Sequence, residues 1–470
     1  MAQLPPAPRP GPGRNPRTVD RTPLRRQGGA IRQERHVPDD ERCGLGACPR
    51  GLDGTDRGPR RLGHAITVRQ VVCLVGGLGT RLGALTQHTP KPLLAVGGRP
   101  FLDYLVDEAN RFGFERLLLL AGHNAHEVVR HYAGRVVGGL SIDVIVETAP
   151  LGTAGALVNA AHALDPVFFL TNGDSFFGFN WLALVPALER DDWTMHLALA
   201  DGVAGGRYGR VETRGNRISR FLPKAESDLP INAGVYLVRR RILERIPGVP
   251  SSLENDVLPP LASEGALLGL ATEGTFIDIG VPDDFSRSQQ VMPAFTRRPA
   301  AFLDRDGVIN HDDNYVHRPE QIRWIDGARE AIRWLNDAGY YVFGVTNQAG
   351  VARGYYGEDE VRSLHGWMQG ELQRAGAHVD RFEYCPYHPE GAIERYRRVS
   401  ELRKPAPGMI LKIRREWNVD WDRSFMIGDR DIDMQAAAAA GIPGHQFLGG
   451  NLLDFVRARV PEIRRSSALR

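Results

Sequence analysis

Two aspartates lie two positions apart at the end of an apolar stretch, in the segment AFLDRDGV. Side chains alternate along a strand, so Asp304 and Asp306 are expected on the same side of it, where two negative charges repel each other. Such crowding is tolerated around a cation, and carboxylate oxygens are preferred ligands of Mg²⁺. The pair therefore predicts a cation-binding site at the end of this strand.

Glycines and positive charges are combined in a second segment, GGLGTRL, which directly follows an apolar run. Gly76, Gly77 and Gly79 permit positive φ angles and a close approach of the backbone to phosphate oxygens. Arg81 and Lys91 add one positive charge on each side of the loop. Such a loop is suited to a triphosphate whose leaving group carries negative charge.

Two common glycine motifs are excluded at this loop. A dinucleotide-binding motif that begins at Gly77 would need a glycine at position 82, where the chain has Leu82. A P-loop that begins at Gly76 would need a Gly-Lys pair, where the chain has Arg81 and Leu82. The loop therefore belongs to another class of phosphate-binding segment.

Short apolar runs separated by longer segments indicate the elements that position these loops. Buried parallel strands consist of continuous apolar runs, and the segments between them are long enough for crossover helices. A polar stretch at 286–298 without clear periodicity is interpreted as a linker, after which the alternation restarts. The pattern predicts an α/β protein with two doubly wound domains. The expected strands are at 71–75, 117–121, 142–146, 167–171, near 300–303, at 341–346 and at 424–427.

Length and composition agree with this organisation. A chain of 470 residues is too long for one hydrophobic core. Residues 1–65 hold ten of the 32 prolines and thirteen arginines but no lysine, and they show no hydrophobic periodicity. Such a segment cannot bury enough apolar surface to offset its ordering entropy, so we expect a disordered tail. The two folded domains are expected to span 68–288 and 299–465.

Charge and cysteine content narrow the class of function. The net charge of +3 gives no reason to expect a nucleic-acid or membrane partner. Cys43, Cys48, Cys73 and Cys385 form no disulfide framework, which is typical of a reducing compartment. The chain has no run of about 18 apolar residues, and we expect no signal peptide. We therefore expect a cytoplasmic protein, whose oligomeric state the sequence does not indicate.

The glycine-rich segment resembles the sugar-1-phosphate nucleotidyltransferases, through GGxGTRL followed by PKPL, and the resemblance extends over about 70–290. It implies a Rossmann-like fold and the attack of a sugar 1-phosphate on the α-phosphorus of an NTP, with pyrophosphate leaving. Asp174 and Asp278 match the positions at which this family binds Mg²⁺. The implied nucleotide contacts are Gly76, Gly77, Gly79, Thr80, Gly152 and Thr153, and the implied catalytic cations are Arg81 and Lys91.

The implied sugar side departs from the usual pattern of that family. The family places a glutamate before the lysine that corresponds to Lys224, whereas this chain has Pro223. One carboxylate acceptor for a sugar hydroxyl is therefore missing, which puts glucose in doubt as the substrate and leaves room for a larger sugar. The positions implied to bind the sugar phosphate are Gly209, Lys224, Asn232 and Glu254.

The segment at Asp304 resembles the haloacid dehalogenase superfamily of phosphatases, and all four motifs of that superfamily appear in order. Only 41 positions separate Asp306 from Asn347, and 56 separate Gln348 from Lys404. Neither interval is long enough for a separate cap domain, so loops are expected to determine substrate specificity. The motifs are DxDGV at 304–308, TNQ at 346–348, RKP at 403–405 and GD at 428–429.

This second resemblance implies a HAD-like fold and a role for each motif. Asp304 would form an aspartyl-phosphate, and Asp306 would protonate the leaving alkoxide and then activate water. Mg²⁺ would bind Asp304, the backbone carbonyl of Asp306 and Asp429. Asp433 would orient either Lys404 or the metal ligands. The implied contacts to the phosphoryl group are Thr346, Asn347, Gln348, Arg403 and Lys404.

Within that superfamily, the segments DRDGVIN, TNQAGVARGYY, CPYHPEG and LRKPAPGM resemble D-glycero-D-manno-heptose 1,7-bisphosphate 7-phosphatases and histidinol-phosphate phosphatases. That group commonly has a structural zinc site. The corresponding positions here are Cys385, Tyr387, Ser400 and Leu402, so three of the four ligands are missing. His388 adds one donor, but two donors do not complete a tetrahedral site. We therefore expect no zinc.

The presence of both segments in one chain suggests consecutive reactions. Removal of the 7-phosphate from heptose 1,7-bisphosphate leaves heptose 1-phosphate, which a nucleotidyltransferase could then use. The hypothesis is a bifunctional enzyme of nucleotide-activated heptose synthesis that uses sugar phosphates, an NTP and Mg²⁺ at both sites, with guanine as the base by family analogy. Two alternatives stay open. One is a hexose-1-phosphate guanylyl- or thymidylyltransferase fused to a phosphatase of another substrate, such as one like histidinol phosphate; in the other, one domain is a degenerate nucleotide-binding regulator.

Overall fold

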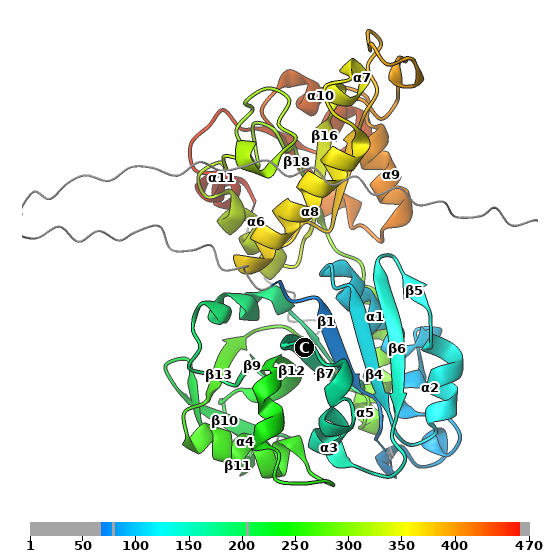
Figure 1. The fold of residues 1–470 in the computed structure, drawn as a ribbon, viewed down its shortest axis with the longest axis vertical. Coiled ribbons are helices and arrows are strands. Elements are labelled where there is room, and N and C mark those ends of the chain that lie inside the picture. The colour runs from blue at the N-terminus through cyan, green and yellow to red at the C-terminus, as the bar shows by residue number, and fades with distance from the viewer. Residues whose placement is uncertain (1–66, 78–79, 204–205, 461–470) are drawn as a thin grey trace, which may run out of the picture. The chain divides into compact units, whose positions relative to one another are not determined.

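The structure is a computed structural model that describes residues 67–460, with gaps at 78–79 and 204–205. The expected tail at 1–65 lies outside the described residues, and so do Cys43, Cys48 and Gly79. In the part that is described, most strands belong to two large sheets (Figure 1).

The first sheet has ten strands in the order β10-β11-β13-β9-β12-β7-β1-β4-β6-β5. β1 (Gln70–Leu74) pairs in parallel with β4 (Arg116–Ala121) and β7 (Val167–Asn172), and β4 pairs in parallel with β6 (Leu140–Val146). These are the four strands expected from the apolar runs, so this part of the prediction is confirmed. The remaining strands are β5 (Val136–Val137), β9 (Met195–Ala200), β10 (Gly209–Arg214), β11 (Arg217–Lys224), β12 (Ile231–Arg239) and β13 (Leu267–Thr272).

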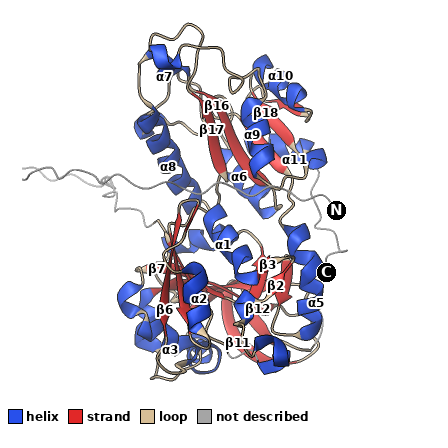
Figure 2. Cartoon of the chain, turned by 90° about the vertical axis from the view of Figure 1, so that its right-hand side faces the viewer, coloured by secondary structure: helices blue, strands red, loops and turns tan. Residues whose placement is uncertain are grey.

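Helices cover both faces of this sheet, as Figure 2 shows. Successive side chains of a strand point to opposite faces, and β1 accordingly sends Val71 and Cys73 into one hydrophobic core and Val72 into the other. The first core contains residues of α1, α2 and α5, and the second contains residues of α3 and α4. These helices are α1 (Phe101–Arg111), α2 (Ala125–Tyr132), α3 (Gly152–Asn159), α4 (Leu258–Ser263) and α5 (Pro282–Phe295).

The second sheet has five parallel strands in the order β17-β16-β15-β18-β19. The expected strands are confirmed as β15 (Ala300–Leu303), β16 (Tyr341–Asn347) and β18 (Phe425–Gly428). The sheet is completed by β17 (Arg381–Cys385) and β19 (Gly444–Gln446). One face carries α6 (Ala328–Asp337), α8 (Glu358–Arg374) and α11 (Leu452–Arg459), and the other carries α9 (Gly408–Glu416) and α10 (Asp431–Ala440). None of the described helices is long and apolar enough to cross a membrane.

The linker expected at 286–298 is wrong, because α5 continues to Phe295. Phe285, Ser288, Met292 and Phe295 recur at intervals of three or four residues, which places them on one face of a helix. Ser288 and Met292 are fully buried, and the Phe295 ring packs edge-on against a core phenylalanine with 4.8 Å between the ring centroids. The helical periodicity of this segment is hard to recognise in the sequence, because a serine occupies one of the buried positions.

A buried group of charges connects elements of the two sheets, which belong to one compact unit. Arg111 at the end of α1 donates from Nε to Asp380 Oδ1 at 2.7 Å, just before β17. Arg298, just before β15, donates from Nη2 to Glu108 of α1 at 2.6 Å. The four side chains are at most 9% exposed. Each positive charge therefore has a carboxylate partner within the low-dielectric interior.

Two candidate catalytic sites

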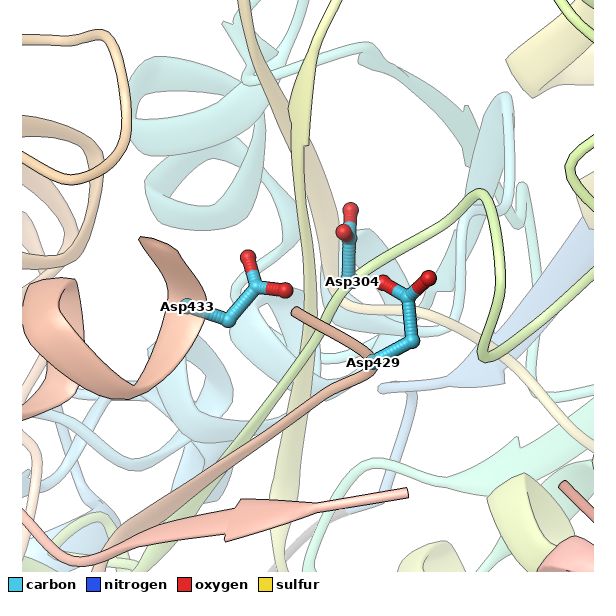
Figure 3. A group of neighbouring side chains, drawn as sticks. All are labelled: Asp304, Asp429 and Asp433. Carbon is cyan, nitrogen blue, oxygen red and sulfur yellow. The ribbon is translucent and has the colours of Figure 1, made fainter. Parts of the chain in front are cut away.

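The second sheet brings three of the four phosphatase motifs to one edge. β15, β16 and β18 are parallel neighbours, so their carboxyl ends place Asp304, Thr346 and Asp429 side by side. The carboxylates of Asp304, Asp429 and Asp433 turn toward one another (Figure 3). The remaining motif supplies Lys404, whose Nζ lies 2.8 Å from Asp304 Oδ1 and 2.7 Å from Asp433 Oδ1. Asp433 therefore contacts Lys404 and also lies beside the carboxylates of Asp304 and Asp429, so its role stays a prediction.

Asp304, Asp429 and Asp433 have the geometry of a cation site. One carboxylate oxygen of each lies within 4.8 Å of the others. Oδ1 of Asp429 is buried without a hydrogen-bond partner, as expected of an atom that ligates a cation. A glycine is needed beside it, because a Cβ at Gly307, where φ is +94°, would lie 2.3 Å from Asp429 Oδ2. These residues fit a divalent cation such as Mg²⁺.

Burial and charge determine the proton affinities at this site. Burial raises the pKa of Asp304 to about 7; Lys404 opposes this rise and Asp433 adds to it. Burial also disfavours the charged form of Lys404, but Asp304 and Asp433 outweigh it, so the pKa of Lys404 is raised. Lys404 therefore remains a fixed positive charge beside Asp304. A bound cation would likewise favour the ionised form of Asp304.

Asp306 is held by three donors. Arg305 donates from Nη2 to both carboxylate oxygens at 2.9 Å, Asn310 donates to Oδ1 at 2.9 Å, and Gln348 donates to Oδ2 at 3.1 Å. Arg305 is fully buried, and its Nη1 lies 3.3 Å from His365 Nε2. Arg305 is not among the site residues expected from the motifs. The sequence does contain a signal for it, because an arginine between two aspartates at the end of a buried strand must find hydrogen-bond partners if it is buried.

The expected phosphate contacts differ in what they bind. The Thr346 hydroxyl lies at the site and accepts a hydrogen bond from Gln348 Nε2 at 2.9 Å. Asn347 instead binds the backbone of Lys404, donating to its carbonyl at 3.0 Å and accepting from its amide at 3.1 Å. Arg403 donates to a backbone carbonyl of the preceding loop at 3.4 Å. In this structure Asn347 and Arg403 therefore hold the segment that carries Lys404.

The four positions considered for zinc belong to two segments that meet at a hydrogen bond between the side chains of Cys385 and Ser400. The buried Cys385 lies with its Sγ 3.8 Å from the Tyr387 carbonyl. The Ser400 hydroxyl accepts from the Leu402 amide at 3.2 Å. The guanidinium of Arg398 lies 3.7 Å from the centroid of the Tyr387 ring. Hydrogen bonds and a cation–π contact therefore stabilise the segments that carry these four positions. The expected absence of zinc stays a prediction.

A cavity of about 410 Å³ opens at the carboxyl ends of β1, β4 and β7 in the first sheet. Arg81 is exposed and does not line it, and the Thr80 side chain is outside the described residues. The expected residues that line this cavity are Gly76, Gly77, Lys91, Gly152, Thr153, Asp174 and Glu254.

Lys91 and two aspartates form a second group that fits a cation. Lys91 Nζ lies 2.7 Å from Asp174 Oδ2. A Cβ placed on Gly280 would lie 2.8 Å from both Asp278 Oδ1 and Lys91 Nζ, so these two atoms adjoin the same glycine. Burial raises the pKa of Asp278, Asp174 adds to the rise, and Lys91 opposes it. Two carboxylates placed beside the same lysine are suited to share a divalent cation.

The expected sugar-binding residues are only partly brought together. Glu254 lines the cavity and accepts from Thr153 Oγ1 at 2.9 Å. Asn232 donates to a neighbouring tyrosine hydroxyl at 2.9 Å and is not among the lining residues. Gly209 and Lys224 are paired across β10 and β11, and both are exposed outside the cavity. Their role in sugar binding stays a prediction.

Glu147 lines the same cavity and is not among the residues expected there. It follows β6, and burial raises its pKa against the opposing hydrogen bond from the Leu151 amide. Two glycines make room for it: a Cβ at Gly76 would lie 3.3 Å from Oε1, and one at Gly122 would lie 3.2 Å from Oε2. The sequence feature that could have indicated Glu147 is its position as an isolated glutamate between a strand and the LGTAG segment.

Comparison with known families separates the two halves of the chain. Residues 70–293 match the nucleotidyl transferase family, and residues 401–452 match the HAD-hydrolase-like family. The nucleotidyl transferase match contains the 410 Å³ cavity, and the second match contains Lys404, Asp429 and Asp433. Both expected domain types are therefore confirmed.

The individual proteins that are similar to this chain each match one part of it. The D-glycero-beta-D-manno-heptose-1,7-bisphosphate 7-phosphatase of Rhodopseudomonas palustris is 54% identical over 171 residues, which are 36% of this chain and 95% of that protein. The enzyme of the same name from Yersinia pestis is 44% identical over 144 residues, 31% of this chain and 77% of that protein. The crystal structure of HddC from Yersinia pseudotuberculosis is 28% identical, with a TM-score of 0.44, and the match covers 48% of this chain and 100% of that chain.

Proposed function

We propose, since this chain belongs to the D-glycero-beta-D-manno-heptose-1,7-bisphosphate 7-phosphatase family, that it removes the 7-phosphate of that sugar and then converts the product to a nucleotide-activated heptose. Each of the two domains matches a family of enzymes. The observation that carries the proposal is the buried Lys404 ammonium between Asp304 and Asp433, beside the unpartnered oxygen of Asp429. The product of the first reaction, a sugar 1-phosphate, is the substrate class of the second.

In the phosphatase reaction Asp304 is the nucleophile. Its carboxylate attacks the phosphorus of the 7-phosphate, the bond to the sugar oxygen breaks, and Asp306 gives that oxygen a proton. Asp306 then takes a proton from water, which attacks the aspartyl-phosphate and releases inorganic phosphate and Asp304. Arg305 and Gln348 hold the Asp306 carboxylate for both transfers. Lys404 stabilises the negative charge on the phosphoryl oxygens.

In the transferase reaction, an oxygen of heptose 1-phosphate attacks the α-phosphorus of the NTP. The α–β phosphoanhydride bond breaks and pyrophosphate leaves. Lys91 and the exposed Arg81 offset the charge that accumulates on the pyrophosphate. Mg²⁺, held by Asp174 and Asp278 here and by Asp304 and Asp429 in the phosphatase, would supply further positive charge to the phosphoryl oxygens.

The nucleotide is proposed to be GTP, and Glu147 supports this choice. An ionised carboxylate offers two hydrogen-bond acceptors and no donor. Guanine presents two adjacent donors, N1–H and the N2 amino group, whereas the other common bases place an acceptor next to their donor. The paired oxygens of Glu147 in the cavity therefore complement guanine better than the other bases.

The proposal is tested with the full-length protein, heptose 1,7-bisphosphate, each NTP in turn and Mg²⁺. We expect inorganic phosphate, then pyrophosphate, then an NDP-heptose, as followed by chromatography and mass spectrometry. Asp304→Asn should lower phosphate release by about 10³-fold or more, since the nucleophile is lost. The same variant should still form NDP-heptose when heptose 1-phosphate is supplied.

The reciprocal control is Asp174→Asn, which should stop pyrophosphate release and leave phosphate release unchanged. Loss of both activities in either variant would indicate a folding defect, which thermal melting would reveal. If the folded wild-type protein released no phosphate from C7, the proposed phosphatase function would be wrong.

A further inference from the structure

Asp306, the proposed general acid and base of the phosphatase, is held by a chain of side chains that reaches back into the protein interior. Arg305 donates to Asp306 Oδ1 from Nε at 3.1 Å and from Nη2 at 2.9 Å, and Nη2 also lies 2.9 Å from Oδ2. On the other side of the guanidinium, Arg305 Nη1 lies 3.3 Å from Nε2 of His365, in the middle of α8. At the site itself, Gln348 Nε2 donates to both Asp306 and Thr346. The side chains are therefore ordered Asp306, Arg305, His365 from the site inward.

The hydrogen bond between Arg305 and His365 defines the protonation state of the histidine. A guanidinium has five N–H donors and no acceptor, so His365 Nε2 must accept. Burial and the charge of Arg305 both lower the pKa of His365 well below its usual value. The ring is therefore uncharged at neutral pH, with its proton on Nδ1. An uncharged ring is the form that can hold Arg305.

The ring of His365 is fixed by its packing. It stacks on Phe382 of β17, with 4.4 Å between the centroids and an interplanar angle of 17°. Tyr384 of the same strand approaches it at 6.0 Å and 64°. His365 is 7% exposed and Arg305 is fully buried. Because little water can reach Nη1 in place of Nε2, the direction of the ring nitrogen determines how the guanidinium lies.

The orientation of the guanidinium matters because Arg305 binds Asp306 through a planar fork. Parallel N–H bonds from one guanidinium to one carboxylate define a single relative geometry. In the proposed reaction Asp306 first gives a proton to the leaving oxygen and then takes one from water, so its carboxyl group must stay within reach of both. A catalytic base that is oriented by a third group is a recurrent arrangement in enzymes. His365 is the fixed end of such an arrangement here.

We propose that His365 is a positioning residue of the phosphatase, which acts through Arg305 to hold Asp306 in place for its two proton transfers. His365 belongs to none of the four motifs and is supplied by the helix between the second and the third of them. The inference rests on the proposed phosphatase function. Arg305 then needs an acceptor at the place of Nε2, rather than a histidine as such.

Two substitutions in full-length protein with Mg²⁺ separate the acceptor from the ring. His365→Phe keeps a ring that can stack on Phe382, but a phenyl edge carries positive partial charge and cannot accept from Arg305. His365→Gln loses the ring but can place an amide oxygen near the position of Nε2. We expect kcat/KM for heptose 1,7-bisphosphate to fall about 100-fold in His365→Phe and less than about five-fold in His365→Gln. Thermal melting should show the opposite order, with His365→Gln the less stable variant because it loses the stacked ring.

The dependence on the leaving group tests whether the effect passes through Asp306. p-Nitrophenolate is a stable anion and leaves with little need of a proton, whereas phenolate and a sugar alkoxide need the proton that Asp306 gives. In His365→Phe, kcat/KM should fall about 100-fold for phenyl phosphate and less than about five-fold for p-nitrophenyl phosphate. His445→Phe is the matched control, because His445 of β19 also lies near a core ring, 5.7 Å from that of Phe425. It should leave the hydrolysis of all three substrates unchanged.

An equal loss with the two aryl phosphates would indicate a general distortion of the site, and no loss in His365→Phe would mean that Asp306 is held without it. Either result would overturn the inference, and so would activities that follow the order of the melting temperatures. If the wild type hydrolysed the aryl phosphates but not the heptose, the proposed substrate would be wrong, and the two aryl phosphates would still decide the role of His365. If it hydrolysed none of the three, the proposed phosphatase function would be wrong, and this inference with it.

Discussion

We expect the choice of nucleotide to depend on Glu147, because this residue lines the cavity and its carboxylate has two acceptor oxygens. Glu147→Gln replaces one acceptor with a donor, which would face the donors of guanine. We expect kcat/KM for GTP to fall about 100-fold, with a smaller change for UTP. Steady-state pyrophosphate release with each NTP measures the preference.

The matched control for this change is Glu115→Gln, which removes the same charge from an exposed side chain of the same domain. It should leave the order of the four NTPs unchanged. An unaltered preference for GTP in Glu147→Gln would mean that another group recognises the base.

At this scale, the sequence predicts residues that carry the chemistry better than residues that position them. Asp304, Lys404 and Asp429 belong to motifs whose resemblance to a phosphatase superfamily implies their roles, and the structure brings them together. Arg305 and Glu147 could not be predicted in the same way. Arg305 contacts His365 and the Val316 carbonyl, and Glu147 lines the cavity. These are tertiary contacts that local sequence does not encode.

At the scale of elements, the parallel strands were predictable and the helix after the first sheet was not. A strand that is buried on both faces is mostly apolar, so β1, β7 and β15 each contain a continuous run of four apolar residues. α5 faces the core with only part of one side, and a buried serine interrupts its apolar stripe. A helix that buries only part of one face is therefore harder to recognise in a sequence than a strand that is buried on both faces.

The contact between β9 and the 3₁₀-helix at Trp181–Glu189 makes stability depend on pH. His196 of β9 is buried, its Nδ1 lies 3.2 Å from the Leu184 carbonyl, and burial lowers its pKa to about 4 against the opposing hydrogen bond. The unfolded chain takes up a proton near pH 6.5 and the folded chain only near pH 4. The free energy of unfolding should therefore fall as pH decreases through this window, by about 3 kcal/mol at most.

His196→Asn tests this prediction, because an amide can still donate to the Leu184 carbonyl but does not titrate. Urea unfolding of wild type and variant at pH 7 and pH 4.5 should show a smaller loss in the variant, by about 2–3 kcal/mol. His162→Asn, at an exposed position, should keep the wild-type dependence. An equal loss in wild type and His196→Asn would mean that His196 does not control this dependence.

At the scale of the whole molecule, the buried charges at α1 connect the two enzymatic domains. Arg111, Asp380, Arg298 and Glu108 balance as two positive and two negative side chains in the interior. Burial disfavours the charged form of Asp380, but Arg111 and His378 outweigh it and lower its pKa. Asp380 is therefore ionised at neutral pH and is needed to keep the group neutral. Loss of the Asp380 charge should lower the stability of both domains, because its partner Arg111 belongs to α1, which packs on the first sheet.

Asp380→Asn makes this coupling measurable. Loss of one partner of a buried ion pair leaves an uncompensated charge, which costs about 3–5 kcal/mol. We expect a lower melting temperature in calorimetry, and phosphate release and pyrophosphate release should disappear over the same temperature range after heating. Asp422→Asn, at an exposed position of the same domain, should change neither. Two separate calorimetric transitions, with only the phosphatase destabilised, would contradict the prediction and show that each domain unfolds independently of the other.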